Sequence, residues 1–169
     1  MNKISNWVKY CLEKIPYRQG RALDLACGKG RHSIFLSNQG YNVLSVDINE
    51  ISLNLFNGRS IRKKAIDVED VNNWPLEEKN FYVIVVTNFL NRTIFPLIIN
   101  SIDTEGYLIY ETFSDGHQNI GRPNNPKYIL KSKELINLTS GMHLLEYEEI
   151  YINNYVNHSF KQRIFTQNV

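Results

Sequence analysis

The stretch LDLACGKG, residues 23–30, determines the fold class that we predict for this chain. It begins as a short apolar run, which is typical of a buried strand, and Gly28 and Gly30 follow at once. Glycine lets the backbone turn sharply and approach a ligand closely. A helical pattern then runs from Arg31 to Asn38. A strand, a glycine turn and a helix in this order form the first unit of a doubly wound α/β fold.

Strands and helices continue to alternate after this unit. Periodic segments predict a helix over about 50–57 and a short helix over 93–100 that breaks near Pro96. Strands that alternate with helices in this way form a parallel sheet. The predicted strands of this part cover residues 22–26, 42–46, 61–66, 81–86 and 106–112.

The two ends of the chain complete the predicted fold. Apolar residues at spacings of three and four predict a helix from Ile4 to Ile15, and a second helix is expected over 132–140. Two last strands, over 143–152 and 158–166, are joined by a short Asn-rich connection and should pair antiparallel. We therefore expect an α/β, Rossmann-like fold in one domain, 1–169. Its mostly parallel seven-stranded sheet carries an antiparallel C-terminal edge hairpin and helices on both faces.

The composition excludes several classes of protein. Hydrophobic residues make up 43% and charged residues 21% of the chain, which are ordinary globular values. A formal net charge of +2, with no run of like charges longer than residues 62–64, argues against a nucleic-acid-binding protein. No membrane-length apolar run and no signal-peptide core are found, so we expect a cytoplasmic protein without a membrane partner.

Metal and disulfide sites are not expected either. Cys11 and Cys27 are the two cysteines, and neither has partners at zinc spacing. The histidines His117, His143 and His158 are scattered in the same way, so we interpret them as structural or surface residues. The oligomeric state stays open between a monomer and a homodimer.

Two carboxylates separate the possible nucleotide ligands. A dinucleotide-binding G-x-G-x-x-G turn requires glycine or alanine at position 33, where Ser33 stands, and it does not explain Asp24 inside the strand. A nicotinamide-dependent oxidoreductase is therefore disfavoured. An acidic residue at Asp24 suits a ligand with a cationic amine, such as S-adenosylmethionine, and Asp47 at the end of the second strand can accept hydrogen bonds from ribose hydroxyls.

The ordered spacing resembles that of a known superfamily. The pattern Asp24-x-x-x-Gly28-x-Gly30, with Asp47 and Asp67 at the next two strand ends, resembles class I S-adenosylmethionine-dependent methyltransferases. More narrowly, LDLACGKGRH (23–32), YETF (110–113) and GRPNNP (121–126) are similar to small bacterial methyltransferases of the tellurite-resistance type. The resemblance covers nearly the whole chain.

The resemblance implies a set of cofactor-binding residues. Asp24 would lie near the amino group of the cofactor, and Asp47 with Ile48 would hold the ribose. Asn88, just beyond the fourth strand, would approach the methionine part and the acceptor. Ala26 stands where the superfamily has its usual first glycine, which crowds the turn. The remaining implied residues are Cys27, Gly28 and Gly30 at the turn, and Asp67 and Val68 near the adenine.

A second group of residues is expected on the substrate side. Arg31 and His32 lie in the first turn of the helix after the glycines, where they reach either substrate or solvent. Tyr110 and Glu111 end the fifth strand, and Arg122 lies in a long loop over 114–131. Together they can orient a small anionic or polar acceptor, or hold the loop down by an internal salt bridge. Within the N-terminal helix and lid segment, 1–18, Tyr17 and Arg18 would close over the site.

The expected function is methyl transfer from S-adenosylmethionine to a small-molecule or chalcogen acceptor. Such an in-line displacement needs positioning and exclusion of water, and no catalytic base is assigned. Asn88-Phe89-Leu90-Asn91 replaces the Asn-Pro-Pro-Tyr motif that is typical of amino methylation of bases or glutamine. Two alternatives stay open: a non-catalytic methyltransferase-like module that binds a protein or RNA, and an RNA methyltransferase.

Overall fold

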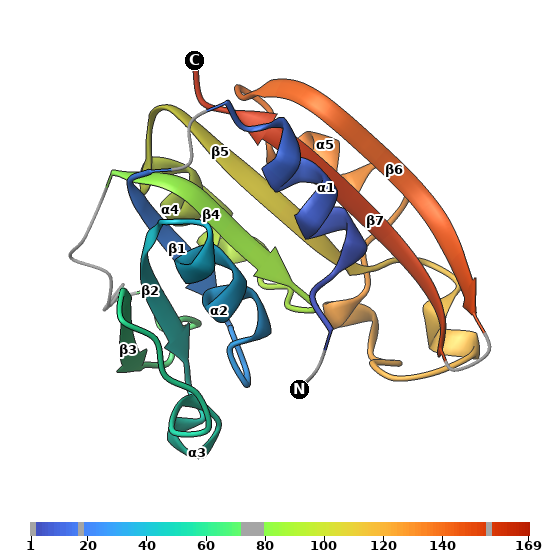
Figure 1. Ribbon diagram of the computed structural model, residues 1–169. Helices are drawn as coiled ribbons and strands as arrows, with labels where there is room; N and C mark the ends of the chain where they lie inside the picture. Colours follow the sequence, from blue (N-terminus) through green and yellow to red (C-terminus); the bar gives the residue numbers. More distant parts are fainter. Residues whose placement is uncertain (1–2, 17–18, 72–79, 155–156) are drawn as a thin grey trace.

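A computed structural model describes residues 3–16, 19–71, 80–154 and 157–169. Its centre is one seven-stranded sheet in the order β3-β2-β1-β4-β5-β7-β6 (Figure 1). The strands are β1 Arg21–Leu25, β2 Asn42–Asp47, β3 Ile61–Ala65, β4 Phe81–Thr87, β5 Ile102–Phe113, β6 His143–Asn154 and β7 Asn157–Gln167. The helices are α1 Asn6–Lys14, α2 Arg31–Asn38, α3 Glu50–Leu53, α4 Phe95–Asn100 and α5 Glu134–Leu138.

The direction of the strands confirms the predicted sheet. β1 pairs in parallel with β2 and β4, and the parallel pairing continues outward to β3 and β5. β7 is antiparallel to both of its neighbours, β5 and β6. The predicted C-terminal hairpin is therefore present, with β6 at the edge of the sheet and β7 inserted beside β5.

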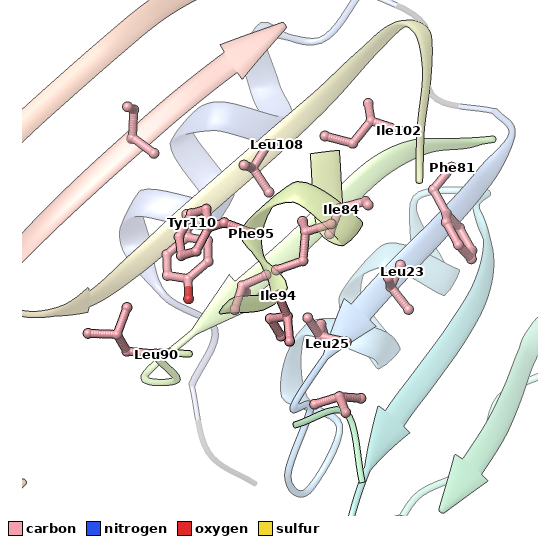
Figure 2. Packing of buried hydrophobic residues seen from close by; sticks show 14 of the residues in the cluster. Leu23, Leu25, Phe81, Ile84, Leu90, Ile94, Phe95, Ile102, Leu108 and Tyr110 are labelled. Atoms are coloured by element: carbon pink, nitrogen blue, oxygen red, sulfur yellow. The ribbon is translucent and has the colours of Figure 1, made fainter. Parts of the chain in front are cut away.

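Helices cover both faces of the sheet, as predicted. Along β4, Val83 and Val85 pack with residues of α1 and α2, whereas Ile84 and Val86 pack with residues of α4 and α5. This alternation follows from the period of two in a strand, and burial on both faces explains why β4 is a continuous apolar run. Figure 2 shows the core on the α4 and α5 side of the sheet. There the ring of Phe95 in α4 stacks on that of Tyr110 in β5, with 4.9 Å between the ring centroids.

Local contacts explain where elements are shorter or longer than the sequence predicts. The helix expected over 50–57 is only Glu50–Leu53, because the Lys63 ammonium donates to the carbonyls of Leu53 and Phe56. α5 begins at Glu134 rather than near residue 132, because Lys133 has a left-handed φ of 57°. β5 begins at Ile102 rather than at residue 106, because Ile102 pairs with Phe81 before a register shift.

Candidate active site

The glycine turn after β1 is built from three residues in the left-handed region. Ala26, Gly28 and Gly30 have φ values of 54°, 54° and 69°. A Cβ at Gly30 would lie 2.4 Å from the ring of Phe56, so this position accepts only glycine without rearrangement. The same conformation at Ala26 costs about 1–2 kcal/mol, which is the strain expected from alanine in place of the first glycine.

Asp47 fastens the end of β2 to this turn. Its Oδ2 accepts the backbone N–H of Gly28 at 2.7 Å, and its Oδ1 accepts that of Asn49 at 2.9 Å. The next residue, Ile48, exposes 69% of its surface although it is apolar. Carboxylate oxygens have further lone pairs, so Asp47 can still accept hydrogen bonds from a ligand on the turn.

Asp24 has an internal partner. Its side chain is 1% exposed, and its Oδ2 accepts a hydrogen bond from the Ser33 hydroxyl at 2.5 Å. The Ser45 hydroxyl donates in turn to Ser33 at 2.7 Å. Burial raises the pKa of Asp24 to about 7, although the Ser33 hydrogen bond opposes this rise. Position 33, where a dinucleotide-binding turn requires glycine or alanine, thus holds the serine that donates a hydrogen bond to Asp24.

A cleft of about 390 Å³ opens beside the glycine turn at the carboxyl ends of β1 and β4. In open α/β sheets, ligands bind at this end of the strands. The cleft unites five of the predicted residues with three that sequence reasoning did not single out, Lys29, Ser52 and Thr87. The five predicted residues on its walls are Ala26, Cys27, Gly28, Arg31 and Asn88.

Asp67 and Val68, the two residues predicted near the adenine, lie in different environments. Asp67 is exposed after β3, and its Oδ1 accepts the backbone N–H of Glu69 at 2.9 Å. Val68 is 5% exposed and packs in the core on the α4 side of the sheet. Neither lies on the described walls of the cleft.

A second cavity of about 630 Å³ adjoins the cleft, because Arg31 and Asn88 line both. Its walls come from segments far apart in the sequence: residues 3–6, β5, the 114–131 loop, β6 and β7. Of the predicted substrate residues, it contains Arg31, Glu111 and Arg122. It also contains His117 and His158, which the sequence analysis treats as structural or surface residues.

Tyr110 and Glu111 do not meet at this cavity, because neighbouring residues of a strand point to opposite faces. Tyr110 is fully buried in the core, where its hydroxyl donates to the carbonyl of Phe89 at 2.7 Å. Glu111 points to the α1 side and accepts Arg163 Nε at 2.8 Å. Tyr110 is therefore not among the described residues that line either cavity.

Lys161 and Arg163 on β7 are functional candidates that the sequence analysis missed. Lys161 Nζ donates to Asn88 Oδ1 at 2.7 Å and lies 3.4 Å from Glu111 Oε1. Burial lowers the pKa of Lys161, although Glu111 opposes this. Burial alone would raise the pKa of Glu111, but the charges of Lys161 and Arg163 outweigh it and hold that pKa below its ordinary value. The signal in the sequence was the alternation of the two cations within the predicted strand over 158–166.

His32 holds the N-terminal segment, residues 3–6, beside the second cavity. It is 1% exposed, and its Nε2 accepts the backbone N–H of Ser5 at 3.3 Å. Burial, helped by the charge of Arg31, lowers the pKa of His32 to about 3, so the ring is neutral and its Nε2 is free to accept. Arg31 Nη1 also donates to the carbonyl of Lys3 at 3.3 Å. Tyr17 and Arg18 lie outside the described residues.

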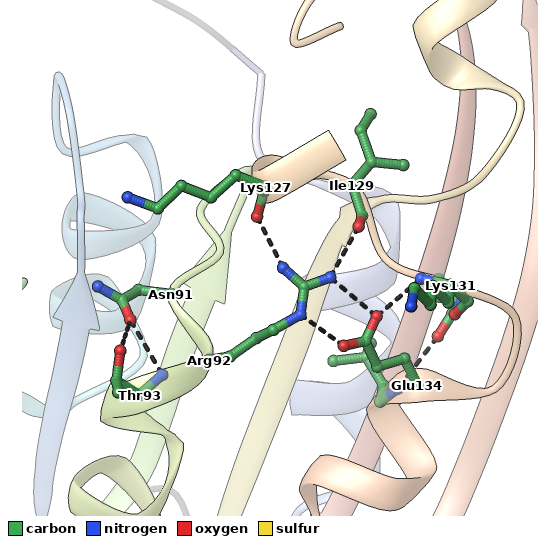
Figure 3. Close-up of polar contacts among 9 residues, drawn as sticks. Asn91, Arg92, Thr93, Lys127, Ile129, Lys131 and Glu134 are labelled. Carbon is green, nitrogen blue, oxygen red and sulfur yellow. Dashed lines mark hydrogen bonds and ion pairs between the residues drawn. The ribbon is translucent and has the colours of Figure 1, made fainter. Parts of the chain in front are cut away.

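The two ends of the loop over 114–131 pair with each other, and Arg92 holds its second half. Ser114 bridges to Leu130, so the two ends of the loop lie side by side. Figure 3 shows Arg92 donating to both carboxylate oxygens of Glu134, at 2.5 and 2.9 Å. It also donates to the carbonyls of Lys127 and Ile129, at 2.7 and 2.8 Å. One guanidinium thus fixes the second half of the loop. The carbonyl of Arg122 is held separately, at 2.9 Å from His117 Nε2.

No group of three or more metal-ligating His, Cys, Asp or Glu side chains occurs in the described part of the chain. None of the described helices is long and apolar enough to cross a membrane.

Comparison with protein families places the chain by sequence. Residues 8–156 match the family of the tellurite resistance protein TehB. The probable S-adenosyl-L-methionine-dependent methyltransferase TehB of Haemophilus influenzae is 36% identical over 88 residues, which are 48% of this chain and 30% of that protein.

Solved structures agree on the fold. Haemophilus influenzae TehB superposes with a TM-score of 0.75 at 22% identity, over 97% of this chain and 62% of that one. The chain therefore spans less than two thirds of that relative. A Mesorhizobium loti S-adenosylmethionine-dependent methyltransferase gives a TM-score of 0.73 at 15% identity, over 95% and 96% of the two chains. Geranyl diphosphate C-methyltransferase from Streptomyces coelicolor, solved with S-adenosyl-L-homocysteine, gives 0.71 at 11% identity, over 95% and 79%.

Proposed function

Because this chain belongs to the family of the tellurite resistance protein TehB, we propose that it is an S-adenosylmethionine-dependent methyltransferase acting on a small-molecule or chalcogen acceptor. The observation that carries the proposal is the junction of the two cavities. The cleft at the glycine turn and the larger basic cavity share Arg31 and Asn88. A donor in the first and an acceptor in the second would meet there. The name of the Haemophilus influenzae relative and the S-adenosyl-L-homocysteine bound by the Streptomyces coelicolor enzyme support this donor.

The residues of the cleft fit S-adenosylmethionine. A Cβ at Gly28 would meet no atom within 4 Å, so the backbone here borders open space that a ligand can approach. Asp47 lies against the same turn, and its carboxylate suits ribose hydroxyls. Exposed Ile48 offers an apolar surface beside it for the base. Asp24, Gly30, Asp67 and Val68 are not among the described residues that line the cleft, and their contacts with the cofactor stay predictions.

The charge of the second cavity favours an anionic acceptor. Among its described lining residues, Glu111 is the single carboxylate, and Arg163 already pairs with it. The cations on the same walls are Lys3, Arg31, Arg122, Lys161 and Arg163. A small anion, such as a chalcogen oxyanion or a carboxylate, would be attracted to this surplus of positive charge.

The proposed reaction asks little of the protein beyond placement. Bound S-adenosylmethionine supplies a sulfonium methyl group, and the acceptor forms a bond to that carbon as the carbon–sulfur bond breaks and S-adenosylhomocysteine leaves. Arg31 and Arg122 bind and orient the acceptor, and Asn88 keeps the boundary between the two ligands. The segment over residues 3–6 is held by Arg31 and His32 and forms part of the wall of the second cavity, where it would limit the access of water. Such positioning reduces the entropic part of the barrier.

Calorimetric titration with S-adenosylhomocysteine tests the proposal, with NADH as comparator. We expect micromolar binding by the wild-type chain and none of NADH. Asp47→Ala should weaken binding by about 10-fold to 100-fold, the loss expected for hydrogen bonds to a charged group. Glu50→Ala is the matched control, because Glu50 carries the same charge in the exposed first turn of α3. Binding of NADH alone would refute the methyltransferase, and binding of neither would favour a partner-binding module.

We also propose that the protein is located in the cytoplasm, on the basis of its cysteines. Cys11 and Cys27 are free thiols, and both are buried. Unpaired cysteines are typical of proteins in a reducing environment, which supports the cytoplasm.

A further inference from the structure

Lys161 occupies the boundary between the two cavities. It projects from β7, is 8% exposed, and its Nζ lies 2.7 Å from Asn88 Oδ1. Asn88 lies just beyond β4 and lines the cleft at the glycine turn as well as the basic cavity. The hydrogen bond thus joins a residue of the C-terminal hairpin to the residue that both ligand spaces share.

Lys161 shares its carboxylate partner, Glu111, with Arg163. Its nearest carboxylate, Glu111, is 3.4 Å away and accepts Arg163 at 2.8 Å through its other oxygen. Arg163 also lies 3.4 Å from Glu148, whereas Glu111 is the one carboxylate that pairs with Lys161 among the described residues. A buried ammonium is unfavourable unless it is well paired, and an apolar side chain of similar length would be better for stability alone. The fold retains the ammonium at a position from which it donates to Asn88.

The contact also determines which way the Asn88 amide faces. A lysine ammonium is a donor only, so the amide oxygen of Asn88 must be the atom that faces it. The NH₂ group lies on the opposite side of the amide and is turned away from Lys161. The backbone of Asn88 is fixed independently, since its φ is 55° and its N–H donates to the carbonyl of Glu111 at 2.9 Å.

We propose that Lys161 is a positioning residue that holds the Asn88 amide with its NH₂ group available to an acceptor atom of the cofactor. This inference rests on the proposed function, because it assigns a role within the same cofactor site. Without Lys161 the amide can flip or rotate, and the cofactor then loses a preorganised donor.

A double-mutant cycle on S-adenosylhomocysteine affinity tests the role. Asn88→Ala and Lys161→Met should each weaken binding by about 3-fold to 10-fold, the equivalent of about one net hydrogen bond. The double variant should bind no more weakly than Asn88→Ala, because both changes remove the same contact. Lys161→Arg, which keeps a donor for Asn88, should restore most of the affinity.

Lys9→Met is the matched control, since Lys9 is an exposed lysine of α1 that lines neither cavity. We expect its affinity to stay within about twofold of the wild-type value, a free-energy change too small for a lost hydrogen bond. Thermal unfolding followed by circular dichroism verifies that each variant is folded. Met is chosen because it fills the volume of the lysine stem and leaves Glu111 paired with Arg163.

Several results would overturn the inference. Wild-type affinity in Lys161→Met, losses that add in the double variant, or an equal loss in Lys9→Met would each exclude positioning through Asn88. Asn88→Asp gives an answer that does not depend on Lys161 variants, because the carboxylate still accepts from Lys161 but carries no NH₂ group. Tight binding by Asn88→Asp would therefore contradict the role of the NH₂ group. Absence of binding by the wild-type chain would instead refute the proposed function, and the positioning role with it.

Discussion

Replacing the buried Asp24 by Asn should change the pH dependence of stability in a direction that the structure sets. The Asp24 carboxyl is 1% exposed, and burial raises its pKa from 3.8 to about 7. Between these values the folded chain binds more protons than the unfolded chain, so the free energy of unfolding falls as the pH rises. The stabilising proton is present in full below about pH 4 and is lost above about pH 7.

The magnitude follows from the size of the shift. A difference of about three pKa units corresponds to about 4 kcal/mol in total, of which between about 2 and 3 kcal/mol falls between pH 5 and pH 8. Asn cannot ionise and can accept the Ser33 hydroxyl through its amide oxygen. Relative to the wild-type chain, Asp24→Asn should therefore gain about 2–3 kcal/mol between pH 5 and pH 8.

Urea unfolding followed by circular dichroism at the two pH values measures this difference. Asp103→Asn is the matched control, because it removes the same charge from an exposed position near the start of β5. Its stability relative to the wild-type chain should change little between the two pH values. If the effect of Asp24→Asn is the same at pH 5 and pH 8, the carboxyl is not protonated in the folded chain and the reasoning fails.

Three further outcomes test other parts of the structure by urea unfolding. Gly30→Ala should destabilise the chain by more than Gly28→Ala, because a Cβ at Gly30 meets the Phe56 ring. At Gly28 the cost is the strain of alanine in the left-handed conformation, about 1–2 kcal/mol. Equal losses would contradict the crowding at Gly30. Arg92→Met should cost about 1–3 kcal/mol and speed proteolysis within residues 114–131, whereas Lys127→Met, which leaves the acceptor carbonyl in place, should do neither. Tyr110→Phe should cost about 1 kcal/mol and leave S-adenosylhomocysteine affinity unchanged; a large loss of affinity would return this residue to the site.

Much of the fold could be predicted from local patterns. The helix over Arg31–Asn38 and the strand beginning at Asn42 lie where the sequence predicts them. Hydrophobic periodicity carries this information, because it reports which side of an element is buried. The shortening of α3 could not be predicted, since the ammonium that donates to the carbonyl of Leu53 belongs to Lys63 on β3.

The grouping of residues at the cleft could be predicted in part, whereas their contacts with the cofactor stay predictions. The residues of a glycine turn are consecutive, so one stretch brings Ala26, Cys27 and Gly28 to the cleft. Asp47 was predictable from its place at a strand end, since parallel strands end at the same edge of the sheet. The predicted role of Asp24 toward a ligand amine stays a prediction, and its hydrogen bond with Ser33 came only from the structure.

The acceptor side depended on tertiary structure. Sequence neighbours Tyr110 and Glu111 were grouped, yet the pleat of β5 sends one to the core and the other towards the cavity. Lys161 was not singled out, because nothing near it in the sequence shows that β7 is inserted beside β5.

The sequence by itself therefore determined the order of elements, the glycine turn and the carboxylates at the strand ends, all of which are written in short segments. Only the tertiary structure decided which charges share a cavity and which are paired. These facts depend on strand order and on contacts such as that of Lys161 with Asn88, 73 residues apart in the chain. Local propensities carry no information about such distances, because they act between neighbours.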